Sequence, residues 1–191
     1  TLFDLRNQLM ETLTSFSEEL SREEFDAIPF INADGYHSKT IAYSIWHIFR
    51  IEDIVAHTLI GEDEQVFFAG NYQERINSPI ITTGNELVKE QIADFSKQLN
   101  LKELYAYIFE VKDSTEKIID SLSYDDLKKK ISEERKEYLK SLNVVSNDEN
   151  AIWLIDYWCG KDIRGLIQMP FSRHWIMHIE ASLRIKNRIH S

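Results

Sequence analysis

Apolar side chains recur every three or four residues along most of the chain, which is the spacing of one buried face of an α-helix. The longest stripes cover residues 2–20, 41–59, 101–122 and 171–189. No long stretch alternates between apolar and polar residues as a half-buried strand would, and residues 80–83 are the one short candidate. The pattern predicts an all-α fold, most simply a four-helix bundle with extra short helices.

The expected helix boundaries rest on residues that favour helix ends. Ser21 and the glutamate three residues later form a capping box, which predicts a short helix after residue 20. Ser38 can cap the second long helix, and Gly61 can end it. Asn100 precedes the third long helix, and Pro170 stands where the last one is expected to begin.

Two segments interrupt the long helices. Residues 61–83 contain two glycines and a proline without a sustained period, so we interpret them as a crossover with about one helical turn. A link of this length can join two parallel helices, and helical pattern resumes near Asn85. Residues 124–141 carry many charges and few apolar anchors, which favours a solvated surface helix. A short apolar and aromatic segment follows at residues 151–158.

Length and composition fit one globular domain. The chain has 191 residues and a mass of 22.5 kDa, and 43% of its residues are hydrophobic. This composition allows a sizeable core and excludes a disordered or fibrous chain. Because no linker or internal repeat interrupts the pattern, we expect residues 1–191 to form a single domain.

The charge and the cysteine content limit which partners the chain could bind and in which cellular compartment it is expected. The chain has 22 Lys and Arg against 32 Asp and Glu, a net charge of −10, so we expect no binding to nucleic acid. Apolar runs such as residues 41–49 fall well short of the roughly 20 residues that cross a bilayer. The first residues do not resemble a secretory signal. With Cys159 as the single cysteine, these features predict a cytoplasmic protein without a membrane partner.

The strongest chemical signal is a histidine pair in the last predicted helix. His174 and His178 are four residues apart, so both imidazoles lie on one face of the helix within reach of a single metal ion. The alternative is that both rings simply pack in the core. Trp175, Ile176 and Ile179 make the flanks apolar, so each unligated ring would need its own buried hydrogen-bond partner. A metal would satisfy both rings together.

His47, in the second long helix, is the best candidate for a third ligand. It also lies in an apolar stretch, and by itself it could be an ordinary core histidine. If the second and last helices pack together, His47 and the pair supply three neutral nitrogen donors and leave open positions for water or substrate. The other histidines fit less well. His57 lies on a different side of the helix, His37 is in a turn, and His190 is near the end of the chain.

Other sequence signals for catalysis are weak. Trp175 follows the first histidine of the pair where the zinc-protease motif HExxH requires glutamate, which argues against such a peptidase. Residues 160–165 begin like a phosphate-binding loop but lack the required Lys and Ser or Thr. There is no nucleophile elbow. Cys159 has no evident base nearby, so a small buried hydrophobic residue is the simpler interpretation.

Several residues near the histidines could shape a pocket. Tyr43 and Arg50 flank His47 at about one helical turn and could orient a polar or anionic substrate; otherwise they are a core tyrosine and an exposed arginine. Three tryptophans could form aromatic walls of this pocket, or they could be ordinary core residues: Trp46, Trp158 and Trp175.

At these residues the chain resembles the DinB/YfiT-like superfamily. The resemblance rests on His47 followed by Glu52 in the second helix, and on His174-x-x-x-His178 ahead of an apolar tail at residues 179–189. It spans most of the chain. The charged segment 124–141 and the Trp- and Gly-rich stretch 153–167 depart from a compact member of that superfamily.

The resemblance implies a four-helix bundle in which a long crossover joins two parallel helices, the second and the third. It implies a divalent metal such as zinc, nickel or iron on His47, His174 and His178, and frequent homodimers. Relatives include transferases and isomerases that use low-molecular-weight thiols such as mycothiol, bacillithiol or glutathione. The superfamily's name reflects induction by DNA damage and does not imply a polymerase.

These observations leave three functions open. The first is an enzyme in which the metal activates a small-molecule substrate, with thiol transfer or isomerisation favoured by the resemblance and hydrolysis as a variant. The second is a non-catalytic acidic bundle that serves in dimerisation or as a stress-response binding protein. The third is a binder of apolar ligands in the bundle core.

Overall fold

A computed structural model describes all residues, 1–191, and every regular element in it is a helix. The single β-type pairing is an isolated bridge between Lys130 and Asp162, so the predicted all-α class is confirmed. In chain order the helices are α1 (Leu2–Glu19), α2 (Arg22–Phe25), α3 (Ile41–Asp53), η1 (Ile54–Gly61), α4 (Val66–Ala69), α5 (Tyr72–Ile76), α6 (Glu90–Gln98), α7 (Leu101–Asp120), η2 (Asp126–Lys128), α8 (Glu133–Ser141), α9 (Trp153–Cys159), α10 (Ile163–Gln168), η3 (Met169–Arg173) and α11 (His174–Ile189).

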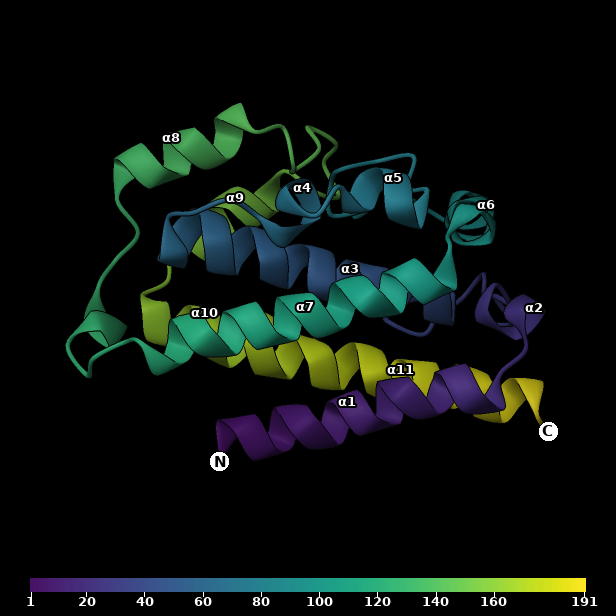
Figure 1. Ribbon diagram of the computed structural model, residues 1–191. Helices are drawn as coiled ribbons and strands as arrows, with labels where there is room; N and C mark the ends of the chain where they lie inside the picture. Colours follow the sequence, from purple (N-terminus) through teal and green to yellow (C-terminus); the bar gives the residue numbers. More distant parts are fainter.

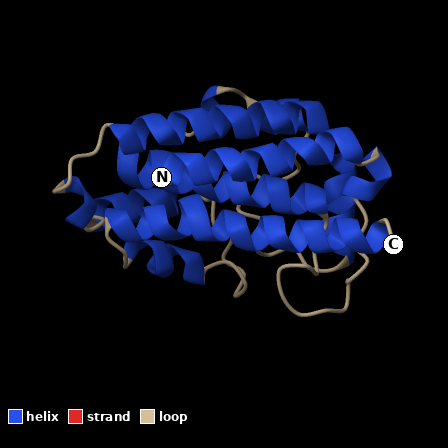
Figure 2. Ribbon diagram, turned by 90° about the horizontal axis from the view of Figure 1, so that it is seen from below, coloured by secondary structure: helices blue, strands red, loops and turns tan.

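The long helices α1, α3, α7 and α11 lie side by side (Figures 1 and 2). Helix α3 contacts α7 and α11, and α11 contacts α1. Hydrogen bonds from Tyr105 to the Leu13 carbonyl, at 2.6 Å, and from Lys112 to Asn7, at 2.7 Å, join α7 to α1. Helices α3 and α7 run in the same direction, opposite to α1 and α11 (Figure 1). The segment between α3 and α7 must therefore cross the molecule, and it contains α4, α5 and α6.

Helix α3 is the centre of the molecule, because every one of its residues is buried. All of its apolar side chains except Ile51 join a core of 26 residues that also draws on α1, α6, α7 and α11. Burial also applies to its polar side chains, which are Ser44, His47, Arg50, Glu52 and Asp53. A buried ionisable group is costly unless it is paired, so each of the four ionisable side chains has to find a partner on another element.

Two of these partnerships fix the position of α3. Glu52 accepts two hydrogen bonds from Arg6 of α1, at 2.7 and 3.0 Å, and a third from the Trp175 indole at 3.0 Å. Asp53 accepts from the backbone amides of Val66 and Phe67, at 2.8 Å each. The first set links α3 to α1 and α11, and the second anchors the start of the crossover.

Most predicted helix ends agree with the structure, and one cap is wrong. The Ser21 capping box is present, and the Asn100 side chain caps α7. Ser38 does not cap α3; its hydroxyl donates to the Gly35 carbonyl, and Thr40 caps the helix by accepting from the Tyr43 amide. Thr40 is one residue before the helix, whereas Ser38 belongs to the preceding turn.

The last helix begins earlier than Pro170 suggests. Helices α10, η3 and α11 follow one another without a break from residue 163 to residue 189, and η3 is a π-helical turn that contains Pro170. Proline lacks an amide hydrogen and clashes with the carbonyl four residues earlier, so a wider turn accommodates it within a continuing helix. The Ser172 hydroxyl donates to the Gln168 carbonyl at 2.7 Å and satisfies one of the carbonyls in this turn.

The insertions contain more short helices than the sequence indicated. Residues 61–83 hold two short helices, α4 and α5, instead of about one turn, and residues 80–83 form no strand. Residues 124–141 are a 3₁₀ turn followed by α8, whose single buried side chain is Leu139, in agreement with a largely solvated helix. None of the helices combines the length and the apolar character that crossing a membrane requires.

Candidate metal centre

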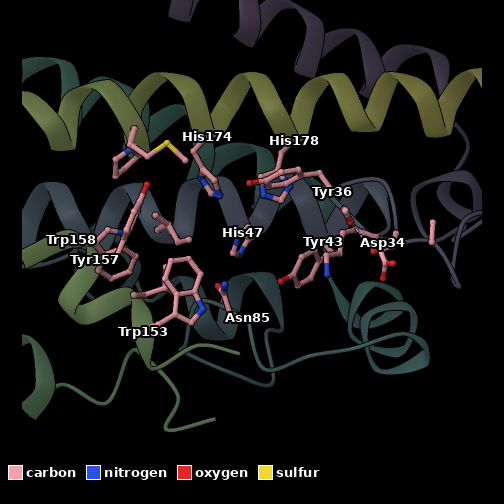
Figure 3. A pocket seen from close by; sticks show the side chains of 18 residues that line it. Asp34, Tyr36, Tyr43, His47, Asn85, Trp153, Tyr157, Trp158, His174 and His178 are labelled. Atoms are coloured by element: carbon pink, nitrogen blue, oxygen red, sulfur yellow. Dashed lines mark hydrogen bonds between the residues drawn. The ribbon is translucent and has the colours of Figure 1, made fainter. Parts of the chain in front are cut away.

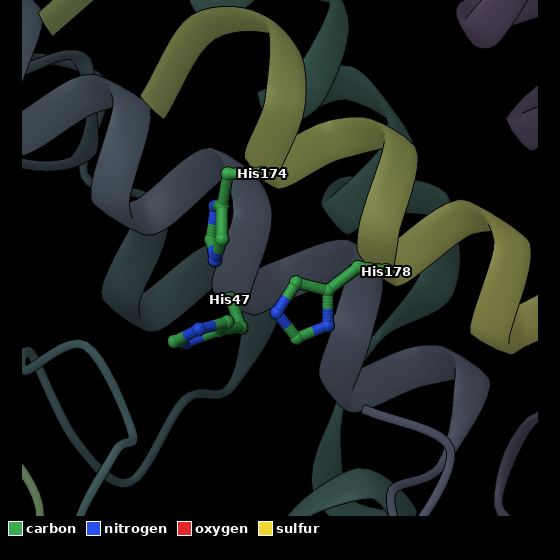
Figure 4. Close-up of side chains that lie close together, drawn as sticks. All are labelled: His47, His174 and His178. Carbon is green, nitrogen blue, oxygen red and sulfur yellow. The ribbon is translucent and has the colours of Figure 1, made fainter. Parts of the chain in front are cut away.

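The three predicted ligands come together where α3 packs on α11. His47 projects from α3 toward His174 and His178 on α11 (Figure 4). One nitrogen from each ring lies within 4.8 Å of the other two. The ring centroids are 5.1 Å apart for His47 and His174, 4.9 Å for His47 and His178, and 4.6 Å for the pair on α11. The i, i+4 spacing thus places both α11 rings on the face that α3 covers.

Burial keeps all three rings in the uncharged form. It lowers the pKa of His47 to about 4, since the ring is removed from water. The pKa values of His174 and His178 fall well below the usual range, first by burial and then by repulsion from the neighbouring rings. A neutral imidazole keeps a nitrogen lone pair, which is the form that binds a metal.

The hydrogen bonds of His47 decide which nitrogen it offers. Its Nδ1 lies 2.6 Å from the Thr83 carbonyl. A carbonyl can only accept, so Nδ1 carries the proton and Nε2 keeps the free lone pair. Such a second bond orients a metal-ligating ring and fixes its tautomer. Thr83 lies in the irregular part of the crossover between α5 and α6, so this segment sets the direction of the ring.

The two rings on α11 lack this support. The Nδ1 atoms of His174 and His178 are buried without a hydrogen-bond partner, and no Nε2 atom of the three rings makes a hydrogen bond. Buried nitrogens without partners are rare in folded proteins and need an explanation. Three neutral imidazoles form a donor set that suits zinc, nickel or iron, so the residues fit a divalent transition metal.

The histidines open into a cavity with a volume of about 520 Å³. A volume of this size is typical of sites for small molecules. Figure 3 shows the histidines in the middle, the aromatic side chains of Trp153, Tyr157 and Trp158 at one end, and Tyr36, Tyr43 and Asp34 at the other. The cavity therefore has two chemically different ends with the candidate metal centre between them.

Two tyrosines pack directly on the ligand rings. Tyr43 stacks on His47 with the ring centroids 5.3 Å apart and the planes 11° from parallel, and its hydroxyl donates to the Gly84 carbonyl at 2.8 Å. Tyr36 meets His178 edge-on at 4.9 Å. These contacts restrict ring rotation, so they help to hold the donors in place.

The other predicted pocket residues divide between cavity and core. Of the two alternatives, Tyr43 and Trp158 line the cavity, whereas Trp46 and Trp175 are core residues. Arg50 neither lines the cavity nor is exposed. It is fully buried, donates to the Ile81 carbonyl at 3.0 Å, and lies over the Phe67 ring.

The remaining histidines and the cysteine lie elsewhere. The two ring nitrogens of His57 hydrogen-bond to Asp63 at 2.5 Å and to Ser114 at 2.9 Å, so this ring is satisfied away from the cavity. His190 pairs with Glu24 at the surface. Cys159 is half-buried, not fully buried as a core residue would be, and burial raises the pKa of its thiol, which disfavours a nucleophilic role.

Several cavity residues were not identified from the sequence. They lie in the turn before α3, in the segment before α6 and on α9, and they are Tyr36, Lys39, Asn85, Trp153 and Tyr157. A usable signal existed on α9, because Trp153 and Tyr157 are four residues apart and share one helix face. The other three residues carried no comparable pattern.

Comparisons with known proteins support the fold and leave the activity open. No family model and no curated protein matches the chain. Among solved structures, it is similar to a conserved protein from Enterococcus faecalis, with a TM-score of 0.57 and 15% sequence identity over 97% of this chain and 91% of that one. A likeness at this identity concerns the course of the backbone, and it extends over nearly the whole helical arrangement.

Proposed function

We propose that this chain is a metal-dependent enzyme in which His47, His174 and His178 hold a divalent transition metal such as zinc, nickel or iron. The observation that carries the proposal is the convergence of three buried, uncharged imidazoles at the wall of a cavity. Three protein ligands leave positions open at the ion, which is the arrangement of catalytic zinc sites, whereas structural sites are closed by a fourth ligand.

We also propose that the chain is a four-helix bundle of the DinB/YfiT-like type. The parallel course of α3 and α7, joined by a long crossover, supports this assignment. So does the position of Glu52, five residues after His47, where it ties α3 to α1 and α11. On this basis the favoured reaction is transfer or isomerisation with a low-molecular-weight thiol, and hydrolysis is the variant with water in place of the thiol.

Bound at this site, a divalent metal would act as a Lewis acid and lower the pKa of a thiol or water molecule. The chain's own residues perform the remaining tasks. The Thr83 carbonyl holds the His47 tautomer, and Tyr43 and Tyr36 limit the motion of the rings. The aromatic side chains of α9 cover one end of the cavity and reduce its contact with water.

Metal content tests the proposal directly. Untagged protein is analysed by plasma mass spectrometry as purified and after reconstitution with zinc, nickel or iron. We expect about one metal ion per chain in the wild type, and its loss in His47→Ala and His174→Ala, because two imidazoles hold an ion far less tightly than three. His190→Ala is the matched control, since this surface histidine should leave the metal content unchanged.

Circular dichroism of each variant separates loss of a ligand from loss of the fold. If the folded wild type takes up no metal after reconstitution, the enzyme proposal is wrong and a non-catalytic binding protein becomes the better explanation. If metal binds, electrophiles are screened with and without thiols. A fourth protein ligand on the metal, detected by X-ray absorption spectroscopy, would also contradict a catalytic role, because it would close the site to substrate.

A further inference from the structure

Lys39 is an unpaired cation in the wall of the cavity. It is the only lysine or arginine among the lining residues, and it forms no ion pair and no hydrogen bond within the chain. Most other buried or half-buried cations here do have partners, such as Arg6 with Glu52 and Lys112 with Glu116. The one acidic residue of the lining, Asp34, is exposed and lies farther from Lys39 than an ion pair would.

The ammonium group of Lys39 lies at the Tyr43 end of the cavity. Its Nζ lies 5.8 Å from the centroid of the Tyr43 ring, the ring that stacks on His47. Its charge also helps to lower the pKa values of His47 and His178. Partial burial lowers the pKa of Lys39 itself, because water is removed and no carboxylate replaces it.

Lys39 is the one cation that lines the cavity, and it lies at the end that also contains Tyr43 and the exposed Asp34. Three neutral imidazoles contribute no negative charge that would offset a metal ion, and Lys39 adds a further positive charge. A negatively charged group would be attracted to this end by both charges. The other end has no charged side chain, and α9 presents Trp153, Tyr157 and Trp158 there (Figure 3).

We infer that the substrate is a carboxylate with an aromatic or similarly large apolar body, and that Lys39 binds its carboxylate and determines this specificity. The apolar body lies against the aromatic side chains of α9, and the histidines face the part of the molecule between its two ends. This inference rests on the proposed function for the reaction itself. The recognition step depends only on the cavity and on Lys39, so it can be tested separately.

The test compares two probes of the same size that differ in charge: 3-phenylpropionate and 3-phenylpropanamide. Isothermal titration calorimetry measures the dissociation constant of each, with zinc-loaded and with chelator-treated protein. We expect wild-type protein to prefer the acid by roughly tenfold in both forms, since a charge-assisted hydrogen bond is replaced by a neutral one. Lys39→Met should abolish the preference in the chelator-treated form, because no other lysine or arginine lines the cavity and the net charge of −10 does not attract an anion.

Two further variants control for side effects. Lys97→Met removes an exposed, unpaired lysine on α6 and should keep the full preference. Lys39→Arg keeps the positive charge and should keep most of the preference for the acid. An equal affinity for acid and amide in the wild type, or an unchanged preference in Lys39→Met, would overturn the role of Lys39. Zinc content, measured in parallel, reports on the metal centre independently, so failure of the one proposal is distinguishable from failure of the other.

Discussion

At the scale of single residues, the buried histidines connect the proposed site to the stability of the protein. In the unfolded chain a histidine has an ordinary pKa near 6.5, whereas in the folded protein burial lowers the pKa of His47 to about 4. Between these values the unfolded state binds a proton that the native state does not. The free energy of unfolding therefore falls as the pH falls through this window, and the contribution is absent above it.

A comparison of metal-free wild-type protein with His47→Gln should show this pH dependence of stability. The substitution removes one titrating ring and keeps a donor for the Thr83 carbonyl. Between about pH 7 and about pH 5, wild-type protein should lose roughly 2 kcal/mol more stability than the variant does. Urea unfolding in the presence of a chelator, followed by circular dichroism, measures both curves. Parallel curves of stability against pH would mean that folding does not lower the pKa of His47 and that water reaches its ring.

The ligands themselves could be predicted from the sequence, but the groups that support them could not. His174 and His178 are four residues apart in an apolar helix, so local geometry alone places them together. The Thr83 carbonyl that orients His47 lies 36 positions away, in the crossover. Backbone carbonyls leave no mark in a sequence, and Lys39 has no periodic pattern that would separate it from an ordinary surface lysine.

At the scale of helices, a buried ion pair fixes how α1, α3 and the turn before α11 meet. Arg6 donates to Glu52 and, at 2.7 Å, to the Phe171 carbonyl in η3, and its guanidinium lies 4.2 Å above the Trp175 ring. Burial raises the pKa of Glu52, and the charge and hydrogen bonds of Arg6 oppose that shift. The pair thus holds the helix that carries His47 against the helix that carries the other two histidines.

Breaking this pair should be costly, because a single substitution leaves the other charge buried without a partner. We expect Arg6→Met to lower the free energy of unfolding by about 3–5 kcal/mol. The double variant Arg6→Met with Glu52→Gln should be less destabilised than Arg6→Met, since the Glu52 carboxylate is then no longer left buried without its partner. Urea denaturation of the two single variants and the double variant gives the coupling energy. Additive effects would show that Arg6 and Glu52 act independently.

The helix boundaries explain where the pattern of apolar residues misleads. A π-helical turn adds a residue to a turn without ending the helix, so a periodicity of 3.6 residues appears to stop while the helix continues. The last helix was expected to begin at Pro170, which lies within the π-helical turn η3 of a continuing helix. At η1 the expectation holds, because the apolar stripe of residues 41–59 continues through this turn to the predicted end at Gly61. The short helices α4 and α5 were missed because four or five residues are too few to display a period.

At the scale of the whole molecule, the core consists of two apolar clusters. The larger one joins α1, α3, α7 and α11, and the smaller one, of 14 residues, joins η1, α8, α9 and α10. Helix α8 contributes little to it, since Leu139 is its only buried side chain. Trp158, at the aromatic end of the cavity, belongs to the second cluster, and the histidines lie at the interface of α3 with α11, so the proposed site lies between the two parts. The expected homodimer and cytoplasmic location stay predictions.

This division predicts an uneven response to zinc in hydrogen exchange followed by mass spectrometry. Amides of α8 should exchange at least about tenfold faster than those of α3 and α7, because few apolar contacts have to break for α8 to open. Zinc should slow exchange in α3 and α11, whose opening breaks the site, and leave α8 unchanged, because a ligand slows only those openings that release it. In His178→Ala the zinc effect should disappear while the difference between α8 and α3 persists. A uniform slowing that includes α8 would mean that the molecule opens as a single unit.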